Sequence, residues 1–323
     1  MATKKSKLIW SNGTLVPWEN ATVHVLSHAL HYGSSVFEGV RVYNTPAGSR
    51  AFRLSDHIER LFNSAALYRI EIPFSQDEII AACAQAVLEN GLNNGAYIRP
   101  IAFRGDAGLG VAAPAGSPVE VAIAAMEWGA YLGAEGLAEG VDVCVSSWQR
   151  VAPNTIPAGV KAGGNYLSSQ LISMEAKRLG FAEGIGLATD GTVSEGAGEN
   201  LFMVKDGVLY TPSSSASILG GITRDTIMML ARDAGLEVIE QAITREALYF
   251  ADELFFTGTA AEVTPIRSVD RMDIGAGCRG PVTEQLQTAF FGLFSGQTED
   301  KRGWLQELEC NTPSYRARVV SSS

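Results

Sequence analysis

Lys161 has unusual neighbours for a lysine, because it follows Val160 and precedes Ala-Gly-Gly at positions 162–164. Lysine side chains are normally exposed, so a surface position is the simplest interpretation of a single lysine. A lysine that attacks a carbonyl group, however, benefits from a desolvated pocket, since burial lowers the pKa of its ammonium group from ~10.4. The spacing of these residues alone leaves both interpretations open.

Two turns of small residues could bind an anion. Residues 219–224, Leu-Gly-Gly-Ile-Thr-Arg, precede an apolar stripe with helical spacing. Residues 257–261, Thr-Gly-Thr-Ala-Ala, follow an apolar run typical of a strand. A Gly-rich turn that enters a helix offers backbone N–H groups and the positive end of the helix dipole to a phosphate or carboxylate. Taken alone, either segment could also be an ordinary turn.

Two other motifs are weaker candidates for binding sites. Residues 108–113 match the GxGxxA dinucleotide fingerprint, but prolines at positions 114 and 118 follow where that fingerprint requires a helix, so a loop is predicted. His24, His28 and His31 have a spacing that could place metal ligands on one helix face. Because no HExxH motif surrounds them, we interpret them as packing or hydrogen-bonding residues and predict no metal site.

The composition argues against several classes of partner. The 323 residues carry a formal net charge of −10, whereas nucleic acid and anionic membranes attract basic patches. No apolar run approaches the ~18 residues of a membrane-spanning helix, and no signal-peptide core follows the polar residues 1–7. Cys83, Cys144, Cys278 and Cys310 are far apart. We therefore expect a cytoplasmic protein with reduced thiols that binds neither nucleic acid nor membrane.

The pattern of turns and apolar stripes predicts an α+β protein. Asn-Gly or Asp-Gly pairs at positions 12–13, 190–191 and 206–207 each separate two strand-like runs, and such pairs supply the positive φ that hairpin turns need. Helices are predicted between the hairpins. A capping box at residues 75–78, for example, begins an apolar stripe that ends at Asn-Gly, positions 90–91. The mixture of hairpins and helices favours an α+β fold over a fold of repeated βαβ units.

The length predicts two domains at about 150 residues each. A Gly-rich stretch at residues 129–140 separates two sets of helices and strands, and we interpret it as the interdomain loop. The expected organisation is a small N-terminal α/β domain at residues 1–128 and a large C-terminal domain at residues 141–310 that carries Lys161. The polar, patternless residues 311–323 are expected to form a disordered tail.

A longer, multipart pattern identifies a family. It starts at Glu195 and continues with Asn200, followed by an apolar and an aromatic residue, then Thr211, then Gly-Ile-Thr-Arg at residues 221–224. This pattern resembles the signature of the class IV aminotransferases, the fold-type IV pyridoxal-phosphate enzymes. The resemblance implies the two-domain α+β fold of that group, related to D-amino-acid aminotransferase, together with transaminase activity. It also implies pyridoxal 5′-phosphate as the cofactor.

Further segments are similar to motifs of the bacterial branched-chain amino-acid aminotransferases within that family. They are residues 28–41, with His-Ala-Leu-His-Tyr-Gly and Val-Phe-Glu-Gly-Val-Arg, and residues 97–100, 161–166 and 194–200. The similarity extends from about residue 8 to about residue 308. It implies transfer of the amino group between leucine, isoleucine or valine and 2-oxoglutarate by a ping-pong mechanism, with these small molecules as the partners.

The resemblance also implies the roles of the cofactor-binding residues. Lys161 would hold the cofactor covalently and carry a proton between substrate and cofactor. Glu195 would keep the pyridine nitrogen protonated, Tyr166 would bind the ring hydroxyl, and Leu219 would pack against the ring. The phosphate would be bound by Arg60, Ile222, Thr223 and Thr259.

The substrate-binding residues implied by the resemblance are Tyr32, Phe37, Arg41, Tyr97, Arg99, Trp128, Tyr131, Thr259 and Ala260. Without the resemblance, core packing would be the simpler interpretation of the aromatic members. Tyr97 and Arg99 alternate on a strand-like run, so we expect both on one face, with Arg99 as the partner of a glutamate γ-carboxylate. In this family Tyr32 and the loop at residues 109–111 reach in from a neighbouring subunit. We therefore expect at least a homodimer, or a larger assembly such as a hexamer.

Two alternative functions stay open. The first is another fold-type IV enzyme, either a D-amino-acid transaminase or an aminodeoxychorismate lyase, which would share Lys161 and Glu195. The segments at residues 37–41 and 97–99 favour the branched-chain enzymes over both. The second is a protein that binds the cofactor without turnover, and the presence of both Lys161 and Glu195 argues against it.

Overall fold

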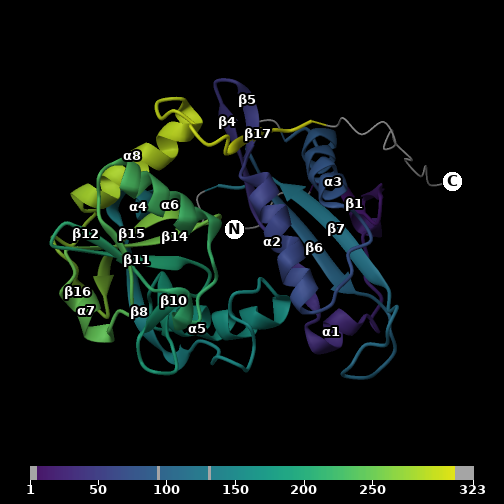
Figure 1. The fold of residues 1–323 in the computed structure, drawn as a ribbon, viewed down its shortest axis with the longest axis horizontal. Coiled ribbons are helices and arrows are strands. Elements are labelled where there is room, and N and C mark those ends of the chain that lie inside the picture. Colours follow the sequence, from purple (N-terminus) through teal and green to yellow (C-terminus); the bar gives the residue numbers. More distant parts are fainter. Residues whose placement is uncertain (1–5, 93–94, 130–131, 310–323) are drawn as a thin grey trace. The chain divides into compact units, whose positions relative to one another are not determined.

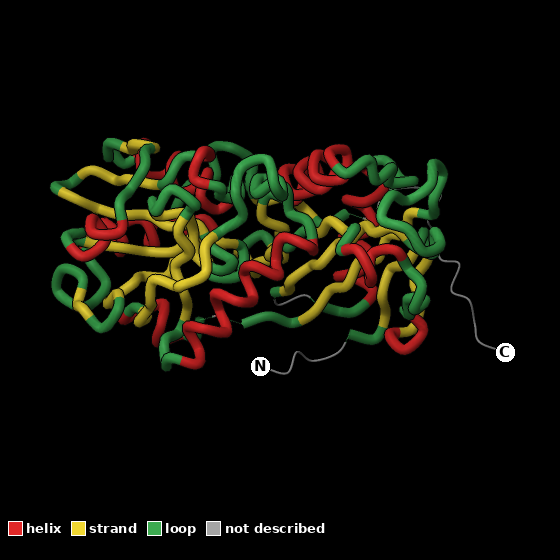
Figure 2. The backbone as a smooth tube through the Cα atoms, turned by 90° about the horizontal axis from the view of Figure 1, so that it is seen from below, coloured by secondary structure: helices red, strands yellow, loops and turns green. Residues whose placement is uncertain are grey.

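The computed structural model describes residues 6–92, 95–129 and 132–309. The chain forms two compact units, each with its own β-sheet (Figure 1). Unit 1 comprises Met1–Trp128, Val160–Gly164 and Asp300–Ser323, and unit 2 comprises Gly129–Gly159 and Asn165–Glu299. Figure 2 shows how helices, strands and loops are mixed along the chain. The fold belongs to the α+β class that the sequence predicts.

In unit 1 the described residues form an eight-stranded sheet in the order β17-β5-β4-β6-β7-β1-β2, with β3 paired to β6. Its strands are β1 (Leu8–Ser11), β2 (Thr14–Pro17), β3 (Ser35–Phe37), β4 (Val40–Thr45), β5 (Gly48–Phe52), β6 (Ala96–Arg104), β7 (Val119–Met126) and β17 (Leu305–Glu307). Its helices are η1 (Trp18–Asn20), α1 (His28–Tyr32), α2 (Leu54–Leu67) and α3 (Gln76–Glu89). Ile58 of α2 and Ile79 of α3 are buried in one core cluster with Ile98 and Ile123 of the sheet, so both helices pack on it.

Two local predictions are confirmed in unit 1. The Ser75 side chain accepts from the Glu78 N–H while the Glu78 side chain accepts from the Ser75 N–H, which is the predicted capping box at the start of α3. Asn12 and Gly13 have φ of 46° and 96° between the paired strands β1 and β2. These values belong to the turn type that Asn-Gly favours.

In unit 2 the described residues form a nine-stranded mixed sheet in the order β10-β9-β8-β15-β14-β11-β12-β13, with β16 paired to β15. Its strands are β8 (Val141–Gln149), β9 (Glu183–Leu187), β10 (Val193–Gly196), β11 (Asn200–Lys205), β12 (Val208–Thr211), β13 (Val238–Glu240), β14 (Glu253–Gly258), β15 (Glu262–Val269) and β16 (Met272–Asp273). The helices after residue 133 are α4 (Ala134–Glu139), η2 (Gly163–Asn165), α5 (Tyr166–Arg178), η3 (Ser214–Ala216), α6 (Ile222–Asp233), α7 (Arg245–Tyr249) and α8 (Pro281–Ser295).

The division of the chain differs from the predicted domains in three places. Residues 129–140, expected to be a loop, contain the helix α4. The segment with Lys161, expected in the C-terminal domain, belongs to unit 1 because Ala162 forms a β-bridge with Val36. Residues 300–309 also belong to unit 1, since β17 pairs with β5. The predicted tail at residues 311–323 lies outside the described residues. The spacing of residues along the sequence does not indicate that later segments of the chain join the first unit.

The weaker motifs behave as ordinary structure. Residues 108–113 form no helix, as the following prolines predict. His28 is buried, and its ring nitrogens lie 2.7 Å from the Ser34 hydroxyl and 2.9 Å from the Gly110 carbonyl oxygen. His31 Nε2 lies 2.9 Å from the Val25 carbonyl oxygen. Among the described residues, no helix has the length and apolar character needed to cross a membrane.

Candidate active site

Lys161 lies in a short segment of unit 1 beside strand β3. The Phe37 N–H donates to the Lys161 carbonyl oxygen at 3.1 Å, and the Lys161 N–H donates to the Ser64 hydroxyl at 3.3 Å. A Cβ atom at Gly163 would lie 2.4 Å from the Ser35 hydroxyl oxygen, so the close approach needs a residue without a side chain. The small residues after Lys161 therefore let its backbone pack against β3, and this positions the lysine.

Four other predicted residues form a continuous set of contacts with the Lys161 side chain. The Lys161 amine lies 5.1 Å from the centre of the Phe37 ring, and the Arg99 guanidinium lies 4.9 Å from the same centre. Arg99 Nη2 donates to the Tyr97 hydroxyl at 2.9 Å, so both side chains share one face of β6, as predicted. Tyr97 stacks on Trp128 with ring centres 4.7 Å apart. We call these five residues the lysine cluster.

Gly39 makes room for the Tyr97 hydroxyl. A Cβ atom at position 39 would lie 1.8 Å from that oxygen. Arg41 is the cross-strand partner of Tyr97 on β4, and its guanidinium lies 5.2 Å from the centre of the Tyr43 ring. Arg41 is thus on a strand that borders the lysine cluster. Tyr131, also predicted for the substrate pocket, lies outside the described residues.

Tyr32 and the loop at residues 109–111 expose apolar surface on unit 1. Tyr32 ends α1, where its ring centre lies 4.5 Å from that of His28, and it is 41% exposed. Leu109 and Val111 are 74% and 84% exposed. The contact between His28 and the Gly110 carbonyl oxygen links this loop to α1. These residues therefore form one exposed apolar region.

Arg60 is held by a buried carboxylate. Arg60 Nε and Nη2 donate to the two oxygens of Glu38 at 2.6 and 2.8 Å, and His57 Nδ1 lies 2.7 Å from Glu38 Oε2. Burial raises the pKa of Glu38, but the Arg60 and His57 charges and hydrogen bonds outweigh it and hold that pKa well below its ordinary value. Burial lowers the pKa of His57 despite the nearby carboxylate. The planar guanidinium is thereby fixed in one orientation.

In unit 2, the buried carboxylate of Glu195 accepts hydrogen bonds from Arg150, Asn200 and Leu219. Arg150 Nη2 donates to Glu195 Oε1 at 2.6 Å, whereas the Asn200 Nδ2 and the Leu219 N–H each donate to Oε2 at 3.0 Å. Asn200, from the predicted signature, also donates to the Leu219 carbonyl oxygen at 2.9 Å. The signature spacing therefore brings Glu195, Asn200 and Leu219 together. Tyr166, which begins α5, is half-buried.

The second half of the signature builds the start of α6. Gly221 is the N-cap residue, and a Cβ atom there would lie 1.9 Å from Asn200 Oδ1, which explains the glycine. Ile222 and Thr223 occupy the first turn and are buried. Arg224 donates to the Thr211 hydroxyl at 3.2 Å, so these two signature residues anchor the helix to β12. No side chain caps this helix start, and its dipole favours an anion there.

Thr259 and Ala260 lie in the turn between β14 and β15 and are both half-buried. Thr257, at the end of β14, is directly opposite Asn200 on β11, so the two side chains point to the same face of the sheet. The Thr257 hydroxyl is fully buried and has no hydrogen-bond partner within the described part of the chain. A buried orphaned hydroxyl beside the signature residues is a feature that a bound polar group would satisfy.

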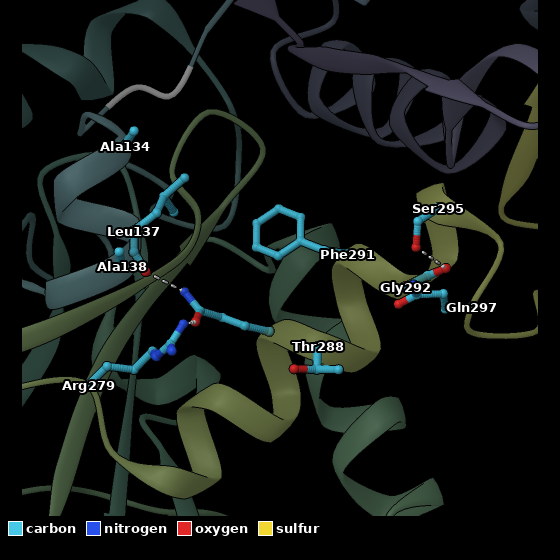
Figure 3. A pocket seen from close by; sticks show the side chains of 10 residues that line it. Ala134, Leu137, Ala138, Arg279, Thr288, Phe291, Gly292, Ser295 and Gln297 are labelled. Carbon is cyan, nitrogen blue, oxygen red and sulfur yellow. Dashed lines mark hydrogen bonds between the residues drawn. The ribbon is translucent and has the colours of Figure 1, made fainter.

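A cavity elsewhere in unit 2 is not the predicted site. It has a volume of about 510 Å³, lies between α4 and α8, and is lined by residues that include Leu137 and Phe291 (Figure 3). None of the predicted site residues lines it. Its arginine, Arg279, is already bound to Glu284 at 2.5 Å and Gln287 at 3.0 Å.

Comparison with known proteins decides the family. The family model for amino-transferase class IV matches residues 35–269. The chain belongs to the class IV aminotransferases. It is 58% identical to the branched-chain-amino-acid aminotransferase of Escherichia coli over 95% of this chain and 99% of that protein. It is 52% identical to the one of Pseudomonas aeruginosa over 92% of this chain and 96% of that protein.

Solved structures of such aminotransferases resemble this one closely. The branched-chain amino acid aminotransferase of Escherichia coli matches with a TM-score of 0.93 and 57% identity over 94% of this chain and all of that one. The T.th. branched-chain amino acid aminotransferase with pyridoxamine 5′-phosphate matches with a TM-score of 0.90 and 46% identity over 94% of this chain and 99% of that one. The predicted fold type is confirmed.

This aminotransferase uses pyridoxal 5′-phosphate, and the chemistry of its donors fits that cofactor. Within unit 1, the amine of Lys161 and the oriented guanidinium of Arg60 are groups of the kinds that this cofactor needs. Within unit 2, the same holds for the carboxylate of Glu195 and the uncapped start of α6. An amine suits an aldehyde, a buried carboxylate suits a pyridinium nitrogen, and helix N–H groups with an arginine suit a phosphate.

Arg150, Glu38 and His57 are site neighbours that the sequence reasoning missed. Glu38 lies within the N-terminal motif at residues 28–41, and nothing in that motif indicates its contact with Arg60. Arg150 follows the last residue of β8 and belongs to no motif. In the sequence it therefore resembles any charged residue at the end of a strand. The one feature of the sequence that could have indicated Arg150 is its position as a charged residue directly after a strand-like run.

Proposed function

We propose that this aminotransferase moves the amino group between the branched-chain L-amino acids leucine, isoleucine and valine and 2-oxoglutarate, by a ping-pong mechanism. The observation that carries the proposal is the lysine cluster, in which the apolar faces of Phe37 and Trp128 and the guanidinium of Arg99 occur together. Apolar rings suit a branched side chain, whereas a buried γ-carboxylate needs a charged partner. The names of the relatives point to the same substrates.

The two kinds of substrate are matched by ligands in one relative. Solved structures of the T.th. enzyme are complexes with 4-methylvaleric acid and with N-(5′-phosphopyridoxyl)-L-glutamate. Because a buried γ-carboxylate needs a charged partner, Arg99 is the proposed partner of the glutamate γ-carboxylate, and Arg41 is a second proposed contact. Tyr32 and Tyr131 contribute hydroxyl groups. The N–H groups at residues 259–260 and the Tyr97 hydroxyl bind the substrate α-carboxylate.

When bound, pyridoxal 5′-phosphate supplies an electron sink that weakens the C–H bond at the substrate α-carbon. Lys161 would hold the cofactor covalently, and its amine would carry a proton between the substrate α-carbon and the aldehyde carbon of the cofactor. Glu195 would pair with the ring nitrogen and keep it protonated. Tyr166 would hydrogen-bond the ring hydroxyl, and Leu219 would pack against the ring.

The residues that would bind the cofactor phosphate are of the kinds that suit an anion. Arg60, oriented by Glu38, supplies a charged donor. Ile222 and Thr223 supply the N–H groups of the first turn of α6, and Thr259 supplies its hydroxyl. These groups carry no proton in the reaction; they bind and orient the cofactor.

The active form is a homodimer or a hexamer in the cytoplasm. The exposed apolar residues Tyr32, Leu109 and Val111 support an interface with a second copy, since such a region on one chain is a binding surface. The described cysteines are free thiols, as expected in a reducing compartment. Sedimentation of Val111→Asp should show smaller particles, and a normal assembly in that variant would argue against this interface.

A substrate panel tests the function. The holoenzyme is assayed with L-leucine, L-isoleucine, L-valine, D-alanine and aminodeoxychorismate, each with 2-oxoglutarate where an acceptor is required. Turnover of the three branched L-amino acids well above the others is expected. Preferred turnover of D-alanine or aminodeoxychorismate would replace the proposal by one of the alternative fold-type IV activities, and no turnover at all would favour a binding protein.

A further inference from the structure

Arg150 is a buried arginine whose charged end contacts the carboxylate proposed to act on the cofactor ring. Its Nη2 donates to Glu195 Oε1 at 2.6 Å, and its Nη1 donates to the Ser169 hydroxyl of α5 at 3.0 Å. The side chains of Arg150 and Glu195 are 5% and 7% exposed. Both charges have therefore lost nearly all contact with water.

The surrounding strands are shaped for this arginine. The Arg150 N–H donates to the Leu187 carbonyl oxygen at 2.8 Å, which fixes its backbone to β9. On the same strand, Gly186 is the cross-strand partner of Glu195. A Cβ atom at Gly186 would lie 3.1 Å from the Arg150 Cγ and 3.2 Å from its Cδ. The glycine therefore leaves space for the arginine stem next to the carboxylate.

Stability alone is a weak explanation of this pair. The cost of desolvating two charges often exceeds their attraction, so apolar residues of similar volume can replace a buried ion pair without loss of stability. The cost is larger here because Arg150 Nε is buried without a hydrogen-bond partner among the described residues. An arginine buried under these conditions points to a use of its charge.

We propose that Arg150 is a positioning residue of this aminotransferase, which keeps Glu195 ionised and fixes its orientation toward the ring nitrogen of the cofactor. This inference rests on the proposed role of Glu195. A buried carboxylate without a cationic partner tends to take up a proton. A neutral Glu195 would no longer hold a proton on the ring nitrogen, so the ring would withdraw electrons less strongly. Asn200 and Leu219 bind the other oxygen and cannot replace the charge.

A double-mutant cycle tests the proposal. Arg150→Met, Glu195→Gln and the double variant are compared with the parent protein in two measurements: the single-turnover rate with L-leucine, and the cofactor dissociation constant from equilibrium dialysis of the holoenzyme. Arg150→Met alone should slow the reaction by about ten- to a hundredfold, the usual effect of losing a hydrogen bond to a charged group. It should also weaken cofactor binding, and Arg150→Lys should restore most of both losses.

The cycle separates an effect through Glu195 from a structural effect. If Arg150 acts through Glu195, then Arg150→Met should change the Glu195→Gln protein by less than about threefold in either measurement. Equal losses in both backgrounds would overturn the proposal. An unchanged rate in Glu195→Gln alone would instead remove the proposed role of Glu195, and the inference with it.

A pair of glycine variants covers the case in which Arg150→Met does not fold. In Gly186→Ala the new Cβ crowds Arg150 and Ile172, whereas in Gly184→Ala the atoms nearest the new Cβ belong to Ile172 and Ala176. The proposal predicts slower turnover and weaker cofactor binding for Gly186→Ala than for its matched control. Equal effects of the two variants would overturn it.

Discussion

Replacing Arg99 by alanine should separate the two half-reactions of the enzyme. The Arg99 guanidinium lies 4.9 Å from the Phe37 ring centre and donates to the Tyr97 hydroxyl at 2.9 Å, so its orientation within the lysine cluster is fixed. Losing a charge-assisted contact with a carboxylate costs about 1.5–3 kcal/mol, which is about ten- to 150-fold in rate. Glutamate and 2-oxoglutarate should be slowed to that extent. Leucine, which has no second carboxylate, should be slowed by less than about threefold.

The assay is single-turnover kinetics of each half-reaction with the purified holoenzyme. Arg104→Ala is the matched control, because Arg104 is on the same strand, β6, but its guanidinium donates to the Tyr68 and Arg69 carbonyl oxygens. The control should affect both half-reactions alike. Equal losses for leucine and glutamate in Arg99→Ala would mean that Arg99 supports the fold or the cofactor, and the reasoning about two substrates would be refuted.

Three further variants test other parts of the site. Lys161→Ala should abolish turnover and the borohydride-trappable link to the cofactor; a labelled peptide that contains another lysine would show the assignment to be wrong. Gly39→Ala should displace the Tyr97 hydroxyl, which lies 1.8 Å from the new Cβ position, and raise the KM for every amino acid; an unchanged KM would contradict this. Glu38→Gln should destabilise the protein by about 3–5 kcal/mol at neutral pH and weaken cofactor binding through Arg60. Because the folded-state pKa of Glu38 lies below its ordinary value of 4.5, the stabilisation is present above pH 4.5 and is lost as pH falls further, so the Tm difference from the parent should shrink there. A Tm difference independent of pH would count against the ion pair.

Several contacts among the candidate site residues were predicted from the sequence. The Glu195–Asn200 spacing and the Gly-Ile-Thr-Arg turn are short-range patterns, and each forms the contact that its residue types suggest. The alternation of Tyr97 and Arg99 on one strand likewise predicted their common face. The Glu195–Asn200 spacing and the Gly-Ile-Thr-Arg turn were assigned through the family resemblance, whereas the shared face of Tyr97 and Arg99 followed from strand alternation alone.

Contacts between segments that are far apart in the sequence were not predictable in the same way. The segment with Lys161 joins unit 1 through a bridge between Ala162 and Val36, which lies far earlier in the sequence. Arg150 binds Glu195, which lies 45 positions later, and nothing in the neighbourhood of Arg150 marks it. These contacts depend on sheet order, and sheet order is set by packing of the whole unit rather than by local propensity.

The most direct test of the proposed activity is a stepwise reaction of one enzyme sample. Holoenzyme is mixed with L-leucine without an acceptor, and the 2-oxo acid formed is quantified. After removal of free substrate, 2-oxoglutarate is added and glutamate is quantified. A branched-chain aminotransferase with a ping-pong mechanism should form the 2-oxo acid of leucine in a stoichiometric amount in the first step and the same amount of glutamate in the second. Formation of no 2-oxo acid from leucine, or no glutamate in the second step, would contradict the proposed function.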